Sequence, residues 1–179
     1  MTEYDAVVYD LDGTLVRLEV DWDVATADVR DVYAEAGLDA AESSLWELLE
    51  AAAEAGLRES VEAVIATHER EGAREARRLP HADELRERTI PTGVCSLNCE
   101  AACRIALANH DLLESVEAVV GRDSVSNHKP HPEPLLEVVE RLEADPGRTL
   151  FVGDSIRDEE TARRAGTDFE YVGDGPSGH

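Results

Sequence analysis

Two carboxylates stand two residues apart in the segment 10–14, which reads DLDGT. A β-rich run at residues 4–10 leads into it, so a strand delivers Asp10 and Asp12 into a glycine turn, where both side chains can face one cavity. A carboxylate is a competent nucleophile toward phosphorus, because the acyl phosphate that it forms is readily hydrolysed. We therefore expect one acid to attack, while Asp12 protonates the leaving oxygen and then deprotonates a water. The alternative is an Asp-Gly turn with solvated acids.

Two further carboxylates, Asp154 and Asp158, follow another apolar run and lie four residues apart. Four negative side chains at one edge of a sheet would repel one another strongly unless a cation lies among them. Ligand sets made only of oxygen favour Mg²⁺, which prefers near-octahedral geometry and retains several waters. The acids therefore predict a magnesium site. The alternative role of Asp158 is to cap the helix that follows, and the two roles are compatible.

The segment 92–98, TGVCSLN, ends a strand with a hydroxyl and then begins a helix. The first N–H groups of a helix and its dipole favour a phosphate oxygen, so Ser96, Leu97 and Asn98 are candidate phosphate contacts. This signal is weak by itself, because Ser96 or Asn98 can equally serve as the helix cap.

Lys129 is the one lysine among 17 basic residues, and prolines at 130, 132 and 134 follow it. Proline suits the first turn of a new helix but cannot continue a preceding one, so it fixes the loop that carries the lysine. A chain that uses arginine elsewhere is expected to keep lysine where a compact ammonium is needed. That ammonium would offset the attacking carboxylate and bind the oxygens of a transferring phosphoryl group. The alternative is a chance surface lysine.

The elements that must position these residues alternate between strand and helix after Pro80. Such alternation predicts an α/β fold, with a Rossmann-like parallel sheet and helices on both faces. Ligands bind beyond the carboxyl ends of the strands in such sheets, which is where the polar segments fall. We expect strands at 4–10, 90–96, 116–120, 149–153 and 169–172, and helices at 99–109, 132–142 and 158–165.

Residues from about 21 to 79 have a helical hydrophobic period throughout, with Gly37 and Gly56 where helix ends are expected. This block interrupts the α/β pattern after the first strand, so it predicts an all-helical insert. We therefore expect a catalytic core at 1–16 and 82–173, a helical cap domain at 17–81 and a flexible tail at 174–179.

The chain has 179 residues, of which 40 are acidic and 17 are basic, so its formal charge is −23, and 42% of it is hydrophobic. This apolar share argues against global disorder, and the charge excludes a protein that binds nucleic acid backbones or anionic membranes. Acidic excess with lysine depletion resembles proteins of salt-loving archaea, so we expect a halophilic protein that low salt destabilises. No basic signal peptide or membrane-length apolar run occurs, which predicts a cytoplasmic protein.

The four segments, in this order across residues 7–166, resemble the four motifs of the haloacid dehalogenase-like (HAD) superfamily, of the phosphatase type. The resemblance implies that Asp10 is the phosphorylated nucleophile and Asp12 the acid and base, with Ser96 and Lys129 on the phosphate. The insert resembles the small helical cap of phosphoglycolate phosphatase-like and β-phosphoglucomutase-like enzymes. Such a cap closes over the site and supplies specificity contacts.

The resemblance also implies the ligands of the cofactor Mg²⁺. They are Asp10, the backbone carbonyl of Asp12, and Asp154, with Asp158 ligating directly or through water. For the remaining candidates we expect structural roles and no contact with substrate. Arg17 is expected to be solvated, and Trp22, Trp46 and His68 are expected to pack within the cap. Cys99 and Cys103 are expected to be buried as small apolar residues.

The predicted function is Mg²⁺-dependent hydrolysis of a small phosphorylated metabolite through an aspartyl-phosphate intermediate. A phosphomutase shares every motif and is the alternative, and a dehalogenase is disfavoured by Asp12 and Lys129. A phosphorylatable receiver-like domain would lack the helical insert between Asp10 and Ser96. A binding protein without activity would have no need of Asp12. The sequence leaves the oligomeric state open.

Overall fold

The structure is a computed structural model that describes residues 3–173 and 175–176. Met1, Thr2 and most of the predicted tail at 174–179 therefore lie outside the described residues. None of the helices among the described residues combines the length and the hydrophobicity that a membrane span requires.

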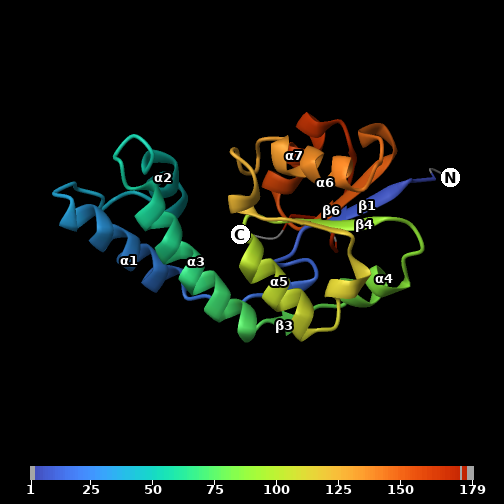
Figure 1. Ribbon diagram of the computed structural model, residues 1–179, viewed down its shortest axis with the longest axis horizontal. Helices are drawn as coiled ribbons and strands as arrows, with labels where there is room; N and C mark the ends of the chain where they lie inside the picture. Colours follow the sequence, from blue (N-terminus) through green and yellow to red (C-terminus); the bar gives the residue numbers. More distant parts are fainter. Residues whose placement is uncertain (1–2, 174, 177–179) are drawn as a thin grey trace.

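Five parallel strands form the central sheet in the order β5-β4-β1-β6-β7 (Figure 1). β1, β4, β5 and β6 are buried along their whole length, as expected for a parallel sheet covered on both faces. The predicted α/β class is confirmed. The strands are β1 (Ala6–Tyr9), β4 (Thr92–Cys95), β5 (Ala118–Val120), β6 (Thr149–Gly153) and β7 (Asp168–Tyr171).

Helices lie on both faces of this sheet (Figure 1). Successive side chains of a strand point to opposite sides, so a buried strand contributes to two clusters. In β1, Val7 and Tyr9 belong to one buried cluster, and Ala6 and Val8 belong to the other. The first cluster is covered by α5 (Glu100–Asn109), and the second by α6 (Glu133–Arg141) and α7 (Ile156–Ala165).

Three helices form the insert that follows the first strand (Figure 1). They share a buried cluster of their own, which includes Val29, Leu48 and Ile65. Gly37 and Gly56 follow the first two helices with positive φ, as their predicted role at helix ends requires. The helices are α1 (Trp22–Glu35), α2 (Leu45–Ala51) and α3 (Arg58–Arg74).

The third helix joins the insert to the core. Val61 and Ile65, in its first half, pack in the insert's cluster, whereas Ala66 and Ala73 pack in the core cluster beneath the sheet. The same helix packs along α5, as Figure 1 shows. The helix α3 therefore connects the buried cluster of the insert to α5, the helix that follows the segment 96–98.

The structure differs from the sequence-based expectation on both sides of Pro80. The block at 21–79 is not all helix, because β3 (Arg77–Arg78) pairs antiparallel with β2 (Val16–Arg17) where the chain leaves and re-enters the core. A helix that the sequence pattern did not predict, α4 (His81–Glu87), follows it. Two-residue strands and a seven-residue helix are too short to produce a clear hydrophobic period.

Candidate active site

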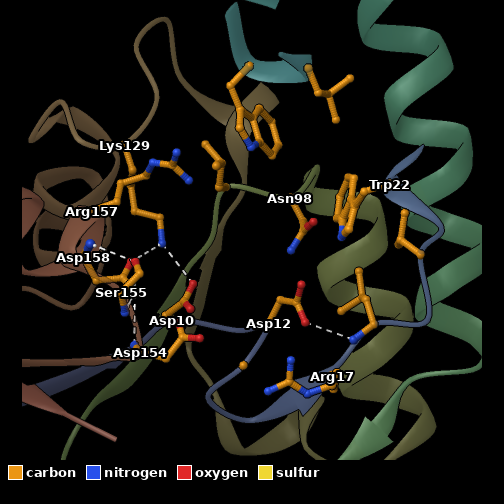
Figure 2. A pocket seen from close by; sticks show the side chains of 16 residues that line it. Asp10, Asp12, Arg17, Trp22, Asn98, Lys129, Asp154, Ser155, Arg157 and Asp158 are labelled. Carbon is orange, nitrogen blue, oxygen red and sulfur yellow. Dashed lines mark hydrogen bonds and ion pairs between the residues drawn. The ribbon is translucent and has the colours of Figure 1, made fainter. Parts of the chain in front are cut away.

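Four separate segments meet at the carboxyl edge of the sheet and line one cavity of about 450 Å³ (Figure 2). Asp10 follows β1, Asp154 follows β6, and Lys129 lies in the loop before α6. Clefts of this size at the ends of parallel strands are the usual place for small ligands. The predicted acids Asp10, Asp12, Asp154 and Asp158 all line it, together with Lys129, Leu97 and Asn98.

Lys129 is buried at the centre of this arrangement, with 3% of its surface exposed. Its Nζ donates to Asp10 Oδ1 at 2.9 Å, to Asp158 Oδ1 at 2.6 Å and to the carbonyl oxygen of Cys95 at 3.2 Å. Burial alone would lower the pKa of Lys129, but the adjacent carboxylates Asp10 and Asp158 raise it above its ordinary value. The alternative of a chance surface lysine is therefore wrong, and the group is a fixed ammonium.

The Asp10 carboxyl is buried between the ammonium and other acids. Burial raises the pKa of Asp10 well above its usual range, Asp158 raises it further, and Lys129 lowers it. Thr14 Oγ1 lies 3.5 Å from Asp10 Oδ2, a long hydrogen bond on the side away from the lysine. A carboxylate that is desolvated in this way is held in place but poorly stabilised, which suits an attacking group.

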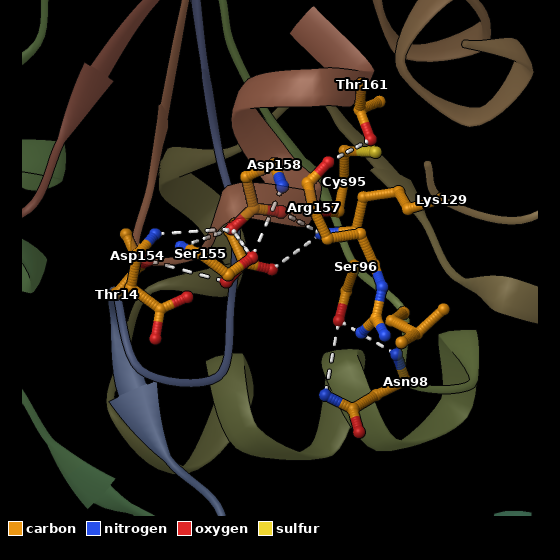
Figure 3. A network of polar contacts seen from close by, with 12 residues as sticks. Thr14, Cys95, Ser96, Asn98, Lys129, Asp154, Ser155, Arg157, Asp158 and Thr161 are labelled. Atoms are coloured by element: carbon orange, nitrogen blue, oxygen red, sulfur yellow. Dashed lines mark hydrogen bonds and ion pairs between the residues drawn. The ribbon is translucent and has the colours of Figure 1, made fainter. Parts of the chain in front are cut away.

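Asp158 lies in the first turn of α7, and both of its oxygens are engaged (Figure 3). Oδ1 accepts from Lys129, and Oδ2 accepts from the Ser155 hydroxyl at 3.0 Å and from the Asp154 N–H at 3.2 Å. The helix cap is Ser155, whose side chain accepts from the Asp158 N–H, so the alternative of Asp158 as N-cap is wrong by three positions. Asp158 thus anchors both the lysine and the turn that carries Asp154.

The buried acids could hold a divalent cation. Asp10, Asp154 and Asp158 each offer a carboxylate oxygen, and these three atoms lie within 4.8 Å of one another. Gly13 has φ +86°, and a Cβ there would lie 2.0 Å from Asp154 Oδ2, so only glycine lets the first turn approach this carboxylate. An oxygen-only donor set with this spacing fits Mg²⁺. The side chain of Asp12 is not part of the group, in keeping with its expected backbone ligation.

The Asp12 side chain faces the cavity from the other side of the turn. Its Oδ1 accepts a hydrogen bond from the Leu18 N–H at 3.0 Å. It is more exposed than Asp10, so the two carboxylates of the DLDGT segment occupy different environments. That difference fits a fixed role for Asp10 beside the Lys129 ammonium and a proton-exchanging role for Asp12.

The segment after β4 differs in detail from the expected phosphate site. Ser96 is buried and does not line the cavity; its Oγ accepts from the Asn98 N–H at 3.1 Å and from Asn98 Nδ2 at 3.3 Å (Figure 3). At the start of α5, the Cys99 N–H donates to Glu69 Oε2 at 2.6 Å, and the Glu100 N–H donates to Asp123 Oδ1 at 2.8 Å. These two helix amides are occupied by carboxylates. Leu97 and Asn98 are therefore the residues of this segment that line the cavity.

Four aromatic or guanidinium-bearing residues that line the cavity were given only structural roles, or none, by sequence reasoning. Arg17 was expected to be solvated, and Trp22 and Trp46 to pack in the cap; both tryptophans do pack against the insert's cluster, but all three residues also line the cavity, as does Arg157. The Arg157 guanidinium lies 5.7 Å from the centre of the Trp46 ring. His68 instead pairs with Asp28 at 2.7 Å, as its predicted cap role implies, and Cys99 and Cys103 are buried as expected.

Arg122 forms a polar network that the sequence did not suggest. It is fully buried, and its guanidinium donates to the Leu97 carbonyl oxygen at 2.7 Å and pairs with Glu62 at 2.5 Å and Glu69 at 2.6 Å. Both glutamates belong to α3. Gly121, which precedes Arg122, lies close against the start of α5, because a Cβ at this position would be only 2.3 Å from the Glu100 nitrogen. The network ties the insert's long helix to the Leu97 wall of the cavity.

The fully buried Glu69 predicts a pH-dependent stability. Burial raises the pKa of Glu69 from 4.5 to about 7, against the lowering effects of Arg122 and the Cys99 N–H. Between these values the folded protein keeps a proton that the unfolded chain has released, so its free energy of unfolding falls as pH rises. Glu69→Gln does not titrate. We expect wild type to lose stability relative to this variant by about 1.4 kcal/mol per pH unit from pH 5 to 7, and nothing further above.

Chemical denaturation at molar KCl and at pH 5, 6, 7 and 8 measures this difference. The matched control is Glu71→Gln, an exposed position two residues further along α3, whose stability should run parallel to that of wild type. Parallel curves for Glu69→Gln as well would contradict the assignment of a raised pKa to Glu69.

Comparison with known proteins identifies the family of this chain. The model of the haloacid dehalogenase-like hydrolase family matches residues 7–172. The phosphoglycolate phosphatase of Salmonella paratyphi A is 48% identical over 60 residues, and that of Escherichia coli is 38% identical over 92 residues. These matches cover 34% and 49% of this chain, but only 24% and 36% of the two relatives.

Among solved structures, a HAD-superfamily hydrolase from Geobacter sulfurreducens is 26% identical, with a TM-score of 0.62. That match covers 94% of this chain and 88% of the other. The resemblance inferred from the four motifs is thereby confirmed. Since the family model spans the first strand, the insert, the lysine loop and the last acidic turn together, this chain belongs to the haloacid dehalogenase-like hydrolase family.

Proposed function

We propose that this protein is a Mg²⁺-dependent phosphatase that hydrolyses a small phosphate monoester through a phosphorylated Asp10. The observation that carries the proposal is the contact between the buried Asp10 carboxylate and the sole lysine, beside a second buried acid at a cavity wall. A fixed ammonium and a desolvated carboxylate are the parts that transfer of a charged phosphoryl group needs. The phosphoglycolate phosphatases named above support phosphate esters as the substrate class.

In the first step, an Asp10 oxygen forms a bond to phosphorus while the bond to the alcohol oxygen breaks. Asp12 gives its proton to that oxygen, so a neutral alcohol leaves. In the second step, Asp12 takes a proton from water, whose oxygen forms a bond to phosphorus as the bond to Asp10 breaks. Free phosphate, the Asp10 carboxylate and the protonated Asp12 result, so the cycle needs no reactant besides the ester and water.

The other residues stabilise charge in these steps. Lys129 lies 2.9 Å from Asp10 and would hold a phosphoryl oxygen on the same side, while Leu97 and Asn98 form the adjacent wall. Asp10, Asp154 and the Asp12 carbonyl would hold Mg²⁺, with Asp158 close by. The ion would supply charge neutralisation for the phosphoryl oxygens. Since the chain is so acidic, these cations offset the negative charge that an approaching phosphate dianion meets.

The test is phosphate release from a panel of esters, including phosphoglycolate, at molar KCl with and without Mg²⁺. We expect activity that EDTA abolishes and Mg²⁺ restores. A phosphomutase would instead isomerise a sugar phosphate without releasing phosphate. Absence of phosphate release from every ester in Mg²⁺ would overturn the proposal. In keeping with the composition, we place this activity in a salt-rich cytoplasm.

Asp154→Asn should lose metal binding. The change removes one negative charge but keeps the shape of a side chain that lies beside Asp10 and Asp158. We expect activity at 1 mM Mg²⁺ to fall by about 10²–10³-fold, and the Mg²⁺ concentration for half-maximal activity to rise. The matched control is Asp31→Asn, an exposed position on α1. An unchanged Mg²⁺ titration would exclude Asp154 as a ligand.

A further inference from the structure

The insert's side of the cavity is built from apolar and aromatic side chains. Both tryptophans of the chain, which is only 4% aromatic, line this cavity. Trp22 begins α1, and Trp46 lies in the first turn of α2. Between Arg17 and Trp46, the lining residues are Arg17, Leu18, Val20, Trp22, Leu45 and Trp46, so Arg17 is the one charged side chain among them.

Most of the polar groups of the cavity come from elsewhere. The carboxylates, the ammonium and Asn98 belong to the core, and Figure 2 shows Trp22 across the cavity from Lys129 and Asp158. Among the described residues of 17–81 that line the cavity, the polar groups are the guanidinium of Arg17 and the two indole N–H groups, and no side chain there is a carboxylate, a hydroxyl or an amide. An alcohol rich in hydroxyl groups would therefore meet mostly carbon on this wall, where its hydroxyl groups lose water and gain few partners.

The two indoles offer a flat surface instead. Their ring centres are 6.0 Å apart with a 51° angle between the planes, which leaves no space for another ring between them. Neither is fully buried, and Arg157 lies over one face of Trp46. A ligand ring can thus lie along the indole pair and near the guanidinium, where aromatic and cation–π contacts both favour a flat, unsaturated group.

We propose that the natural substrate is a phosphate monoester whose alcohol carries a flat unsaturated ring, which contacts Trp22 and Trp46. The proposal rests on the proposed function for the phosphoryl group of the substrate, and it adds the chemical class of the alcohol to which that group is bound. In a cavity of about 450 Å³, the charged core wall takes the phosphoryl group and the insert's apolar wall takes the ring. Phosphoglycolate and polyhydroxylated sugar phosphates fit this wall poorly.

The test uses benzyl phosphate and glycerol 3-phosphate, both esters of primary alcohols, as probes. Binding is followed by intrinsic fluorescence in Asp10→Asn with Mg²⁺ at molar KCl, because both fluorophores line the cavity. We expect benzyl phosphate to shift the emission and to bind at least about tenfold more tightly than glycerol 3-phosphate. In wild type, kcat/KM should favour benzyl phosphate by a similar factor.

Trp46→Leu keeps an apolar side chain for packing and keeps Trp22 as the reporter. It should reduce the preference for benzyl phosphate at least about fivefold, whereas Leu38→Ala, at an exposed residue of the insert, should preserve it. Equal affinities for the two esters, or an unchanged preference in folded Trp46→Leu, would overturn the inference. If esters are hydrolysed without this preference, only the inference fails; if no ester is bound or hydrolysed, the proposed function fails with it.

Discussion

Asp10→Asn is expected to abolish phosphate release, with a loss of at least about 10⁴-fold in kcat. The amide has nearly the shape of the carboxylate and stays within reach of Lys129, but it does not form the acyl phosphate. Burial and the neighbouring Asp158 carboxylate both raise the pKa of Asp10, which means that its negative charge is unfavourable there. Removal of that charge therefore relieves repulsion from Asp158. The variant should therefore fold at least as stably as wild type while losing its activity.

The measurement is phosphate release under single-turnover and steady-state conditions at saturating Mg²⁺, with thermal unfolding measured in parallel. Asp31→Asn, at an exposed position on α1, is the control for a change of one charge on a highly acidic protein. When the reaction is quenched with acid, covalently bound phosphate should be recovered on the wild-type protein but not on Asp10→Asn. Phosphate release at comparable rates by the variant would remove the proposed nucleophile.

The part of the site that the sequence predicts comes from strand ends. Asp10, Asp154 and Lys129 are far apart in the chain, yet all fall at the carboxyl edge of a parallel sheet once the strands are recognised. The ammonium then lies 2.9 Å from Asp10, across 119 positions of sequence. Topology makes this contact predictable, because every strand of such a sheet ends on the same side.

What the sequence does not predict depends on how the insert meets the core. Trp22 and Trp46 have the spacing of packed helix residues, and period alone does not show that they also border a cavity. Glu69 and Arg122 look like two ordinary surface charges until α3 packs against α5 and buries them together. Such contacts arise from side-chain fit between distant elements, which leaves no local pattern.

Lys129→Met is the second change with a large expected effect, and it acts on both stability and rate. Loss of the ammonium leaves the carboxylates of Asp10 and Asp158 buried together without the cation that lies between them. Removal of one partner of a buried ion pair costs about 3–5 kcal/mol. Loss of a fixed cation beside the transferring phosphoryl group should lower kcat by about 10²–10³-fold or more. Thermal unfolding and phosphate release measure the two effects separately.

The double variant Lys129→Met/Asp158→Asn separates them. It removes one carboxylate together with the ammonium, so most of the lost stability should return, because the repulsion within the buried cluster is relieved. The rate should stay low, since the double variant restores stability without restoring the ammonium beside Asp10. Arg141→Met, which removes an exposed cation paired with Glu137 on α6, should leave both quantities near wild type. If stability and rate instead recover together in the double variant, Lys129 acts only by neutralising its neighbours and has no part in phosphoryl transfer.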